Sequence, residues 1–107
     1  MASVEHVASV DDLAPGACKR VTVQGRDVLL VNVAGEHSAV SADCPHAGGP
    51  LDEGVLESEV VECPWHGSRF SCLTGEIVNG PALDPLTKYA VIIRGNDVLV
   101  DVSLASA

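Results

Sequence analysis

The sequence predicts an all-β protein built from antiparallel strands. Short runs rich in Val, Leu and Ile recur along the 107 residues, and turn-forming residues separate them. No segment of about a dozen residues keeps the apolar period of a capped helix, and only Asp11-Asp12-Leu13 is expected to form a single turn. Hydrophobic residues make up 47% of the chain but aromatic residues only 3%, so aliphatic side chains must build the core. A Val-rich composition of this kind favours strands.

The apolar runs give the order of the expected strands. They lie at residues 3–8, 17–24, 27–33, 37–41, 59–62, 88–94 and 97–102. Turns at 14–16, 24–27, 34–36 and 95–97 contain Gly, Pro, Asn or Asp, which tolerate tight or positive-φ geometry. The last turn closes a terminal hairpin in which Val91 and Ile93 are expected to face Val98 and Val100.

Residues 43–81 differ from the segments on either side in their content of Gly and Pro and in the length of their apolar runs. Gly and Pro punctuate this stretch and leave room only for short strands. A β framework before and after an irregular insert is how a rigid scaffold presents a site on loops. The chemistry of the protein is therefore expected in this insert.

Two Cys/His pairs lie in the insert, one in Asp43-Cys44-Pro45-His46 and the other in Cys63-Pro64-Trp65-His66. Residues two apart in extended backbone point to the same side, so Cys44 and His46 can reach a common centre from one tight turn. The segment between the pairs contains an apparent hairpin that would bring them face to face. Nearby prolines stiffen the loops, and glycines allow close approach of the backbone to a bulky group.

Two thiolates and two imidazoles suit either of two metal centres. One is a single tetrahedral zinc, and the other is a [2Fe-2S] cluster with one iron on sulfur and one on nitrogen. A zinc finger usually pairs Cys with Cys and His with His, whereas each loop here carries a mixed pair, C-x-H and then C-x-x-H. The order therefore favours the iron cluster, with structural zinc as the alternative.

These two motifs resemble those of the Rieske family, whose pattern is C-x-H, a gap of this size, and C-x-x-H within Cys-Pro-x-His-Gly. The resemblance covers most of the chain. It implies a Rieske-like antiparallel β-sandwich or barrel, with 43–81 as an inserted cluster-binding subdomain of loops and short strands in a single domain, 1–107. It also implies one Rieske-type [2Fe-2S] cluster, with Cys44 and Cys63 on the inner iron and His46 and His66 on the outer one.

The resemblance also implies residues that support the cluster. Ser68 occupies the position of a serine that donates a hydrogen bond, and Pro81 follows Gly80 in a loop that covers the cluster from a third side. Trp65 is expected to pack over or shield the cluster, and Gly67 to let the backbone approach it. Phe70 stands where high-potential relatives carry a Tyr, and their additional Cys pair is absent. We therefore expect a reduction potential nearer the low end, typical of ferredoxins that serve oxygenases.

The function implied by the resemblance is that of a one-electron carrier, not of an enzyme. Such a ferredoxin takes an electron from a flavoprotein reductase and passes it to a terminal oxygenase, for example a ring-hydroxylating dioxygenase, by docking transiently near His46 and His66. An oxygenase itself needs a large further domain, which 107 residues exclude. The alternative is a small Rieske subunit of a larger enzyme, similar to that of nitrite reductase.

Charge and composition limit the partners further. The net charge of −9 argues against nucleic acid, because nucleic-acid affinity depends on cationic side chains. The same charge would draw the protein towards positively charged surfaces, although many acidic domains are acidic only for solubility. The first residues lack a basic region followed by an apolar one, and no apolar run approaches membrane-spanning length. We therefore expect a cytoplasmic protein with no membrane partner, in which cysteines bind metal or stay reduced.

Five residues with functional side chains are set apart from the proposed site. Cys18 and Cys72 are expected to be small buried hydrophobes, and His6 and His37 to be surface histidines. Arg69 could pair with an acidic neighbour or with a partner protein, and the sequence leaves both open.

Overall fold

The computed structural model describes residues 4–44, 48–65, 67–80 and 84–106, the last four of these by their backbone alone. This part of the chain contains ten strands and two 3-10 helices, which confirms the all-β prediction. The elements are β1 Val4–Ser9, η1 Val10–Asp12, β2 Cys18–Val23, β3 Arg26–Val33, β4 Glu36–Ser41, η2 Leu51–Glu53, β5 Val55–Glu57, β6 Val60–Glu62, β7 Arg69–Ser71, β8 Ile77–Asn79, β9 Lys88–Arg94 and β10 Asp97–Ser106.

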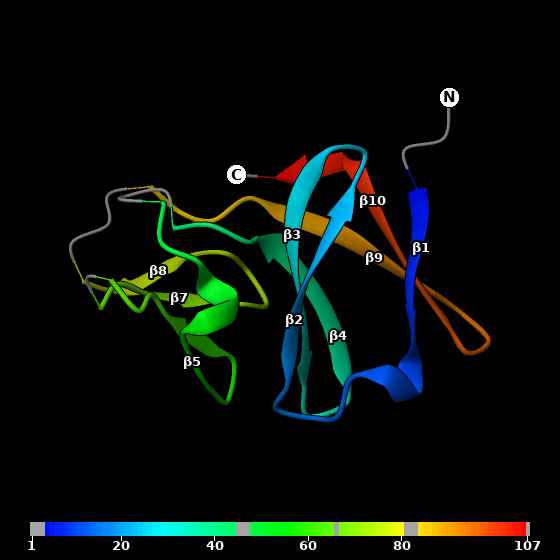
Figure 1. Ribbon diagram of the computed structural model, residues 1–107, viewed down its shortest axis with the longest axis horizontal. Coiled ribbons are helices and arrows are strands. Elements are labelled where there is room, and N and C mark those ends of the chain that lie inside the picture. Colours follow the sequence, from blue (N-terminus) through cyan, green and yellow to red (C-terminus); the bar gives the residue numbers. More distant parts are fainter. Residues whose placement is uncertain (1–3, 45–47, 66, 81–83, 107) are drawn as a thin grey trace.

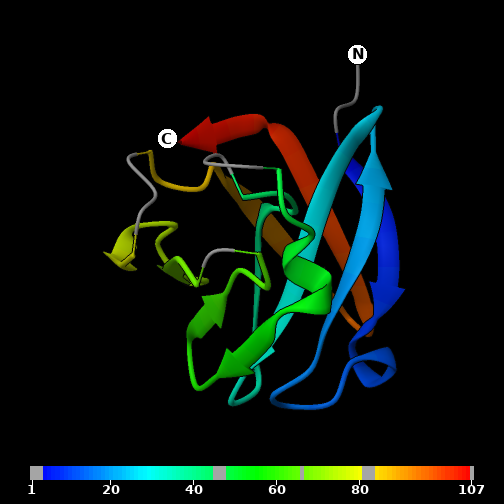
Figure 2. The ribbon, with the colours of Figure 1, turned by 60° about the vertical axis from the view of Figure 1, so that its left-hand side comes forward.

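The larger sheet has six antiparallel strands in the order β1-β10-β9-β4-β3-β2 (Figure 1). Its two edge strands, β1 and β2, come into contact with each other. Glu5 of β1 accepts a hydrogen bond of 2.7 Å from the backbone N–H of Gln24, the residue that follows β2. The sheet therefore curls into a nearly closed barrel, which is visible when the molecule is turned (Figure 2).

The smaller sheet is formed entirely by the insert, in the order β5-β6-β7-β8. It lies to one side of the barrel together with η2 (Figure 1). The apparent hairpin of the sequence is β5 and β6, paired antiparallel from Val55↔Glu62 to Glu57↔Val60. Of these four strands only β6 matches a predicted run, 59–62, which includes the two consecutive valines Val60 and Val61; β5, β7 and β8 have three residues each and show no comparable apolar run.

Strand β3 is buried on both faces and connects the two halves of the core. Val28 and Leu30 point into the barrel, whereas Leu29 and Val31 pack towards the small sheet. The second set of side chains forms an apolar layer between barrel and insert, which we call the shared layer. Its buried members are Leu29, Val31, Val40, Ala42, Cys44, Leu51, Val61, Cys63, Phe70, Cys72 and Leu86. The insert is thus packed directly onto the strands of the barrel.

The terminal hairpin has the register that its sequence predicts. Val98 lies opposite Ile93, and Val100 lies opposite Val91. Strand β9 matches the predicted run 88–94, while β10 continues beyond the predicted residue 102 to Ser106. The turn expected at 11–13 appears as η1. Within the described ranges, the helices are single turns and none could cross a membrane.

Candidate metal centre

The two loops that carry Cys44 and Cys63 share one pattern of backbone hydrogen bonds. The N–H of Cys44 donates to the carbonyl of Gly49, five residues on (2.8 Å), and Cys63 N–H donates to the carbonyl of Ser68 (2.8 Å). In return, Gly48 N–H donates to the Cys44 carbonyl (2.7 Å) and Gly67 N–H to the Cys63 carbonyl (3.1 Å). The site is therefore built from two equivalent loops.

A glycine four residues after each cysteine makes this loop shape possible. Gly48 and Gly67 both have φ of 75°, in the left-handed region that side-chain-bearing residues avoid. This C-x-x-x-G spacing was present in both motifs and would have predicted the equivalence of the loops. The histidines do not share it, because His46 lies two residues after its cysteine and His66 three.

In each loop, the residues just before and just after it are joined by backbone pairing. The first is closed by a bridge between Asp43 and Pro50, and the N–H of Leu51 donates to the carbonyl of Ala42 at 2.9 Å. We call residues 42–43 and 50–52 the two arms of the first loop. The second loop connects β6 to β7, which pair through Val61↔Phe70 and Glu62↔Arg69. Both cysteines thus follow directly on paired backbone.

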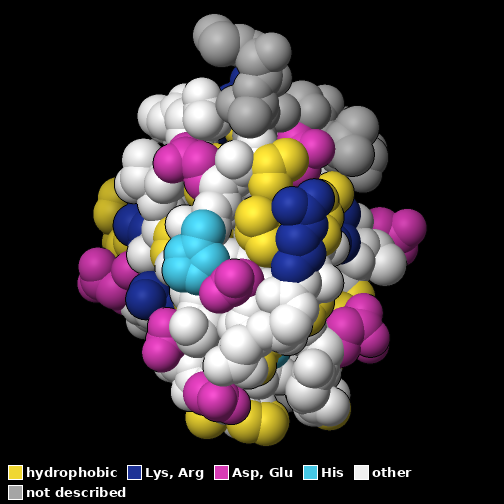
Figure 3. All heavy atoms as spheres, turned by 90° about the vertical axis from the view of Figure 1, so that its right-hand side faces the viewer, with side chains coloured by type: hydrophobic (Ala, Val, Ile, Leu, Met, Phe, Trp, Pro, Cys, Tyr) yellow, Lys and Arg dark blue, Asp and Glu magenta, His cyan; other side chains and the backbone are white. Residues whose placement is uncertain are grey.

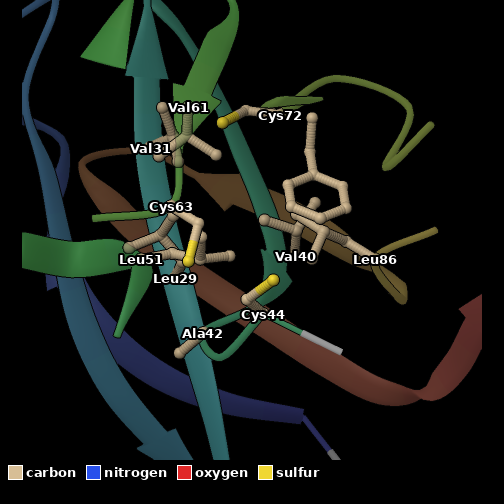
Figure 4. Packing of buried hydrophobic residues seen from close by; sticks show 11 residues of the cluster. Leu29, Val31, Val40, Ala42, Cys44, Leu51, Val61, Cys63, Cys72 and Leu86 are labelled. Atoms are coloured by element: carbon tan, nitrogen blue, oxygen red, sulfur yellow. The ribbon is translucent and has the colours of Figure 1, made fainter. Parts of the chain in front are cut away.

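Both thiols are buried at the same end of the shared layer. Cys44 and Cys63 are each 1% exposed. Figure 4 shows their sulfur atoms near Ala42, whereas Cys72 lies at the opposite end of the layer. The sequence prediction that two separate loops bring their cysteines together is consistent with this placement. His46, His66 and Pro81 lie outside the described residues, so no group of three possible metal ligands occurs within the described ranges.

Gly49 is the point at which the two loops touch. A Cβ atom at this position would lie 2.6 Å from Cys63 Sγ and 3.2 Å from the ring of Trp65. Only a glycine therefore lets the first loop come this close to the second thiol. Trp65 lies across this contact while 57% of it remains exposed, so it covers the junction of the loops from outside.

A third segment, which contains Gly80, packs against the second loop. Gly80 has φ of 105°, and a Cβ atom there would lie 2.5 Å from Ser68 Cα and 3.2 Å from the Gly67 carbonyl oxygen. Ser68 is fully buried beneath this contact, and Phe70 is also fully buried. Two residues after Ser68, Phe70 contributes an apolar ring and no hydroxyl to the buried interior.

The remaining cysteines and the two described histidines belong to neither of the two loops. Burial raises the pKa of Cys72 to about 12, helped by the nearby charges of Cys18 and Glu59, and burial also raises the pKa of Cys18. Both therefore stay protonated at neutral pH. Cys72 is a small buried hydrophobe, as predicted, whereas Cys18 is only partly buried. His6 is exposed and lies 3.3 Å from Asp97, as expected of a surface residue. His37 is partly buried, and its Nε2 is a buried atom with no hydrogen-bond partner among the described residues.

Arg69 pairs within the protein, which decides the question that the sequence left open. Its Nε lies 2.8 Å from Glu62 Oε1, across the register pair of β6 and β7. The pair joins the strands immediately before and after the second loop. Its side chains are 45% and 38% exposed, so the stabilisation is about 1 kcal/mol at most.

The fold is an antiparallel β-barrel with an inserted small sheet, and it buries two thiols on a pair of equivalent loops. The chain belongs to the Rieske [2Fe-2S] domain family, whose model matches residues 3–90. Its cofactor is accordingly a Rieske-type [2Fe-2S] cluster. The described residues fit this group, because two buried thiols from separate loops lie at one end of an apolar layer.

Comparison with known proteins places the chain among ferredoxins. It is 42% identical over 99 residues to the biphenyl 2,3-dioxygenase ferredoxin component of Rhodococcus jostii strain RHA1, covering 92% of each chain. The ferredoxin of carbazole 1,9a-dioxygenase from Nocardioides aromaticivorans IC177 superposes with a TM-score of 0.88 at 35% identity, over 92% of this chain and 97% of that one. A chain in a complex of reduced oxygenase and oxidised ferredoxin of carbazole 1,9a-dioxygenase superposes with a TM-score of 0.89 at 29% identity, over 94% of each chain.

Proposed function

We propose that this protein is a ferredoxin that carries one electron from a flavoprotein reductase to a terminal oxygenase, such as a ring-hydroxylating dioxygenase. The observation that carries the proposal is the pair of equivalent loops, which bury two thiols between barrel and insert. The similarity to ferredoxin components over nearly the whole of both chains supports it. The protein is then one component of an oxygenase system and is not itself the catalyst.

The ligand set belongs to the proposal. Cys44 and Cys63 would hold the inner iron, and His46 and His66 the outer one, within one domain of residues 1–107 in the cytoplasm. When bound, the cluster accepts and releases a single electron. Neutral imidazoles in place of two thiolates raise the reduction potential above that of an all-cysteine cluster. Buried Ser68 and Phe70, with only one hydroxyl between them, favour the lower part of the range of roughly −150 to +300 mV that Rieske centres cover.

Purification under low oxygen tests the proposal. We expect a coloured protein with two iron atoms per chain, and an EPR signal of a mixed-ligand [2Fe-2S] cluster after reduction. A colourless protein that contains zinc and no iron would show the structural zinc alternative instead. Stoichiometric co-purification with a large subunit would favour the nitrite-reductase-like subunit over a diffusing carrier.

The docking surface for the oxygenase is expected near His46 and His66, at the insert. Figure 3 shows the face over β1 and the β9–β10 turn, remote from the small sheet. Acidic side chains there are scattered among basic and apolar ones and form no single patch. This remote face therefore carries no concentrated charge.

The net charge of −9 predicts that electron transfer depends on salt. Raising ionic strength from about 0.01 M to 0.15 M shortens the screening length from roughly 30 Å to 8 Å. We expect the bimolecular rate of oxygenase reduction to fall at least severalfold, because attraction to a positively charged surface is screened. Stopped-flow measurement at both salt concentrations checks this. A rate that rises with salt would contradict an electropositive partner surface.

A further inference from the structure

Arg20 of β2 makes more ion-pair contacts than any other basic residue in the described ranges. Its Nη2 lies 2.7 Å from Asp43 Oδ1 and 2.9 Å from Asp52 Oδ1, and its Nη1 lies 3.1 Å from Asp27 Oδ2. Its Nε also donates to Asp52 Oδ1 at 3.0 Å. One guanidinium therefore engages three carboxylates through three different nitrogen atoms.

Two of the three partners of Arg20 lie on the arms of the first ligand loop, and the third, Asp27, lies on β3. Asp43 is on the incoming arm, directly before Cys44, and Asp52 is on the returning arm, in η2. Nη2 also donates to the carbonyl of Ala42 at 3.4 Å, next to the backbone bond that joins the arms. Because Arg20 itself belongs to the barrel, its side chain connects both arms of the first loop to the larger sheet.

The contact is only partly exposed to solvent, which distinguishes it from an ordinary surface ion pair. The side chains of Arg20 and Asp52 are 28% and 26% exposed, while that of Asp43 is 48% exposed. The hydrogen bond to Asp43 raises the pKa of Arg20 most, and the hydrogen bond to Asp52 raises it further, so the guanidinium is always charged. Hydrogen bonds between charged groups are roughly twice as strong as neutral ones, and a planar guanidinium holds its partners in fixed directions.

We propose that Arg20 is a positioning residue for the cluster, because its guanidinium holds both arms of the first loop against β2 and so fixes where Cys44 presents its thiol. Arg20 acts through Asp43 and Asp52 and does not itself touch the sulfur. This inference rests on the proposed function, since it assumes that Cys44 is a ligand. It adds a residue outside the insert to the set that determines the properties of the cluster.

Arg20 could instead affect the cluster only through its positive charge. An Arg20→Lys substitution distinguishes this explanation from the positioning role. An Arg20→Lys chain keeps the positive charge, but a single ammonium cannot hold three carboxylates in the directions that a guanidinium fixes. An Arg20→Gln chain loses both charge and geometry. Arg26→Gln is the matched control, because Arg26 is an exposed residue of β3 and its replacement changes the net charge equally.

The experiment measures three quantities on the iron-loaded chains: the EPR g-values of the reduced cluster, the reduction potential, and the rate at which a chelator bleaches the visible absorbance. We expect Arg20→Gln and Arg20→Lys both to bleach about tenfold faster than the unaltered protein and to show shifted g-values. Only Arg20→Gln is expected to have a clearly lower potential, since only it leaves the three carboxylates uncompensated. Arg26→Gln should match the unaltered protein in g-values and bleaching.

The outcomes that overturn the inference are specific. If Arg20→Lys leaves the g-values and the bleaching rate unchanged, Arg20 acts on the cluster through its charge alone. If Arg20→Gln behaves as Arg26→Gln does, Arg20 does not position the cluster. Should both Arg20 variants fail to fold, Asp52→Asn keeps the shape of the side chain but removes its negative charge, and it must bleach faster for the inference to stand. Absence of a Rieske-type EPR signal in the unaltered protein would instead contradict the proposed function. Failure of the inference about Arg20 can therefore be distinguished from failure of the proposed function.

Discussion

A Cys63→Ala chain is expected to contain no [2Fe-2S] cluster and to be colourless. Cys63 is one of two buried thiols on the paired loops, and its removal would leave an iron without one of its protein ligands in a site that water cannot readily enter. We expect iron content below about a tenth of that of the unaltered protein, with the visible absorbance and the EPR signal lost together. Metal analysis of chains purified side by side measures this effect.

Cys72→Ala is the matched control for this substitution. Cys72 is a fully buried thiol of the same shared layer, but it lies at the opposite end from Cys44 and Cys63 (Figure 4). Its replacement removes one sulfur atom from a packed core, which costs about 1 kcal/mol of unfolding free energy and leaves the ligands in place. Full iron content in Cys63→Ala, or loss of the cluster in Cys72→Ala alone, would show that the ligands have been assigned wrongly.

Gly49→Ala is expected to give the second largest effect, although it adds a single methyl group. The added carbon would lie 2.6 Å from Cys63 Sγ, which is closer than van der Waals contact allows, so one loop must move. Packed interiors resist such insertions at a cost of about 1–3 kcal/mol. Because the thiol itself is displaced, we expect iron content to fall at least severalfold and the remaining EPR signal to broaden.

The neighbouring glycine separates this steric effect from backbone strain. Gly48 has φ of 75°, but a Cβ atom there meets nothing within 4 Å. Gly48→Ala should therefore lose roughly 1–2 kcal/mol of stability, measured by urea unfolding, because an alanine resists the left-handed region. Its cluster should have the ordinary EPR spectrum. A Gly49→Ala chain with full iron and an unaltered spectrum would mean that the loops do not meet at this glycine.

The parts of the fold with strong local patterns could be predicted from the sequence. The alternation of Val91, Ile93, Val98 and Val100 around a Gly-Asn-Asp turn fixed the register of the terminal hairpin. Strands β7 and β8 have only three residues each, and their pairing depends on contacts within the insert. No local pattern could have given their bounds.

The same distinction applies to the site. The Cys and His motifs were enough to show a resemblance to the family, and the resemblance implied the cofactor, because each motif is contained in a few consecutive residues. Arg20 was missed because its partners Asp43 and Asp52 are 23 and 32 residues away, and an arginine in a strand carries no sign of such contacts. The close approach of Gly49 to Cys63 likewise depends on the position of the second loop, so the sequence of the first loop could not have predicted it.

The shared layer also affects how easily an electron can enter and leave. Leu29 and Val40, which belong to long strands of the barrel, lie close to the two sulfur atoms (Figure 4). Aliphatic groups in a close-packed interior have few dipoles to reorient when a neighbouring charge changes by one unit. Little energy is then spent on rearranging the surroundings at each transfer, and a brief encounter with a partner suffices.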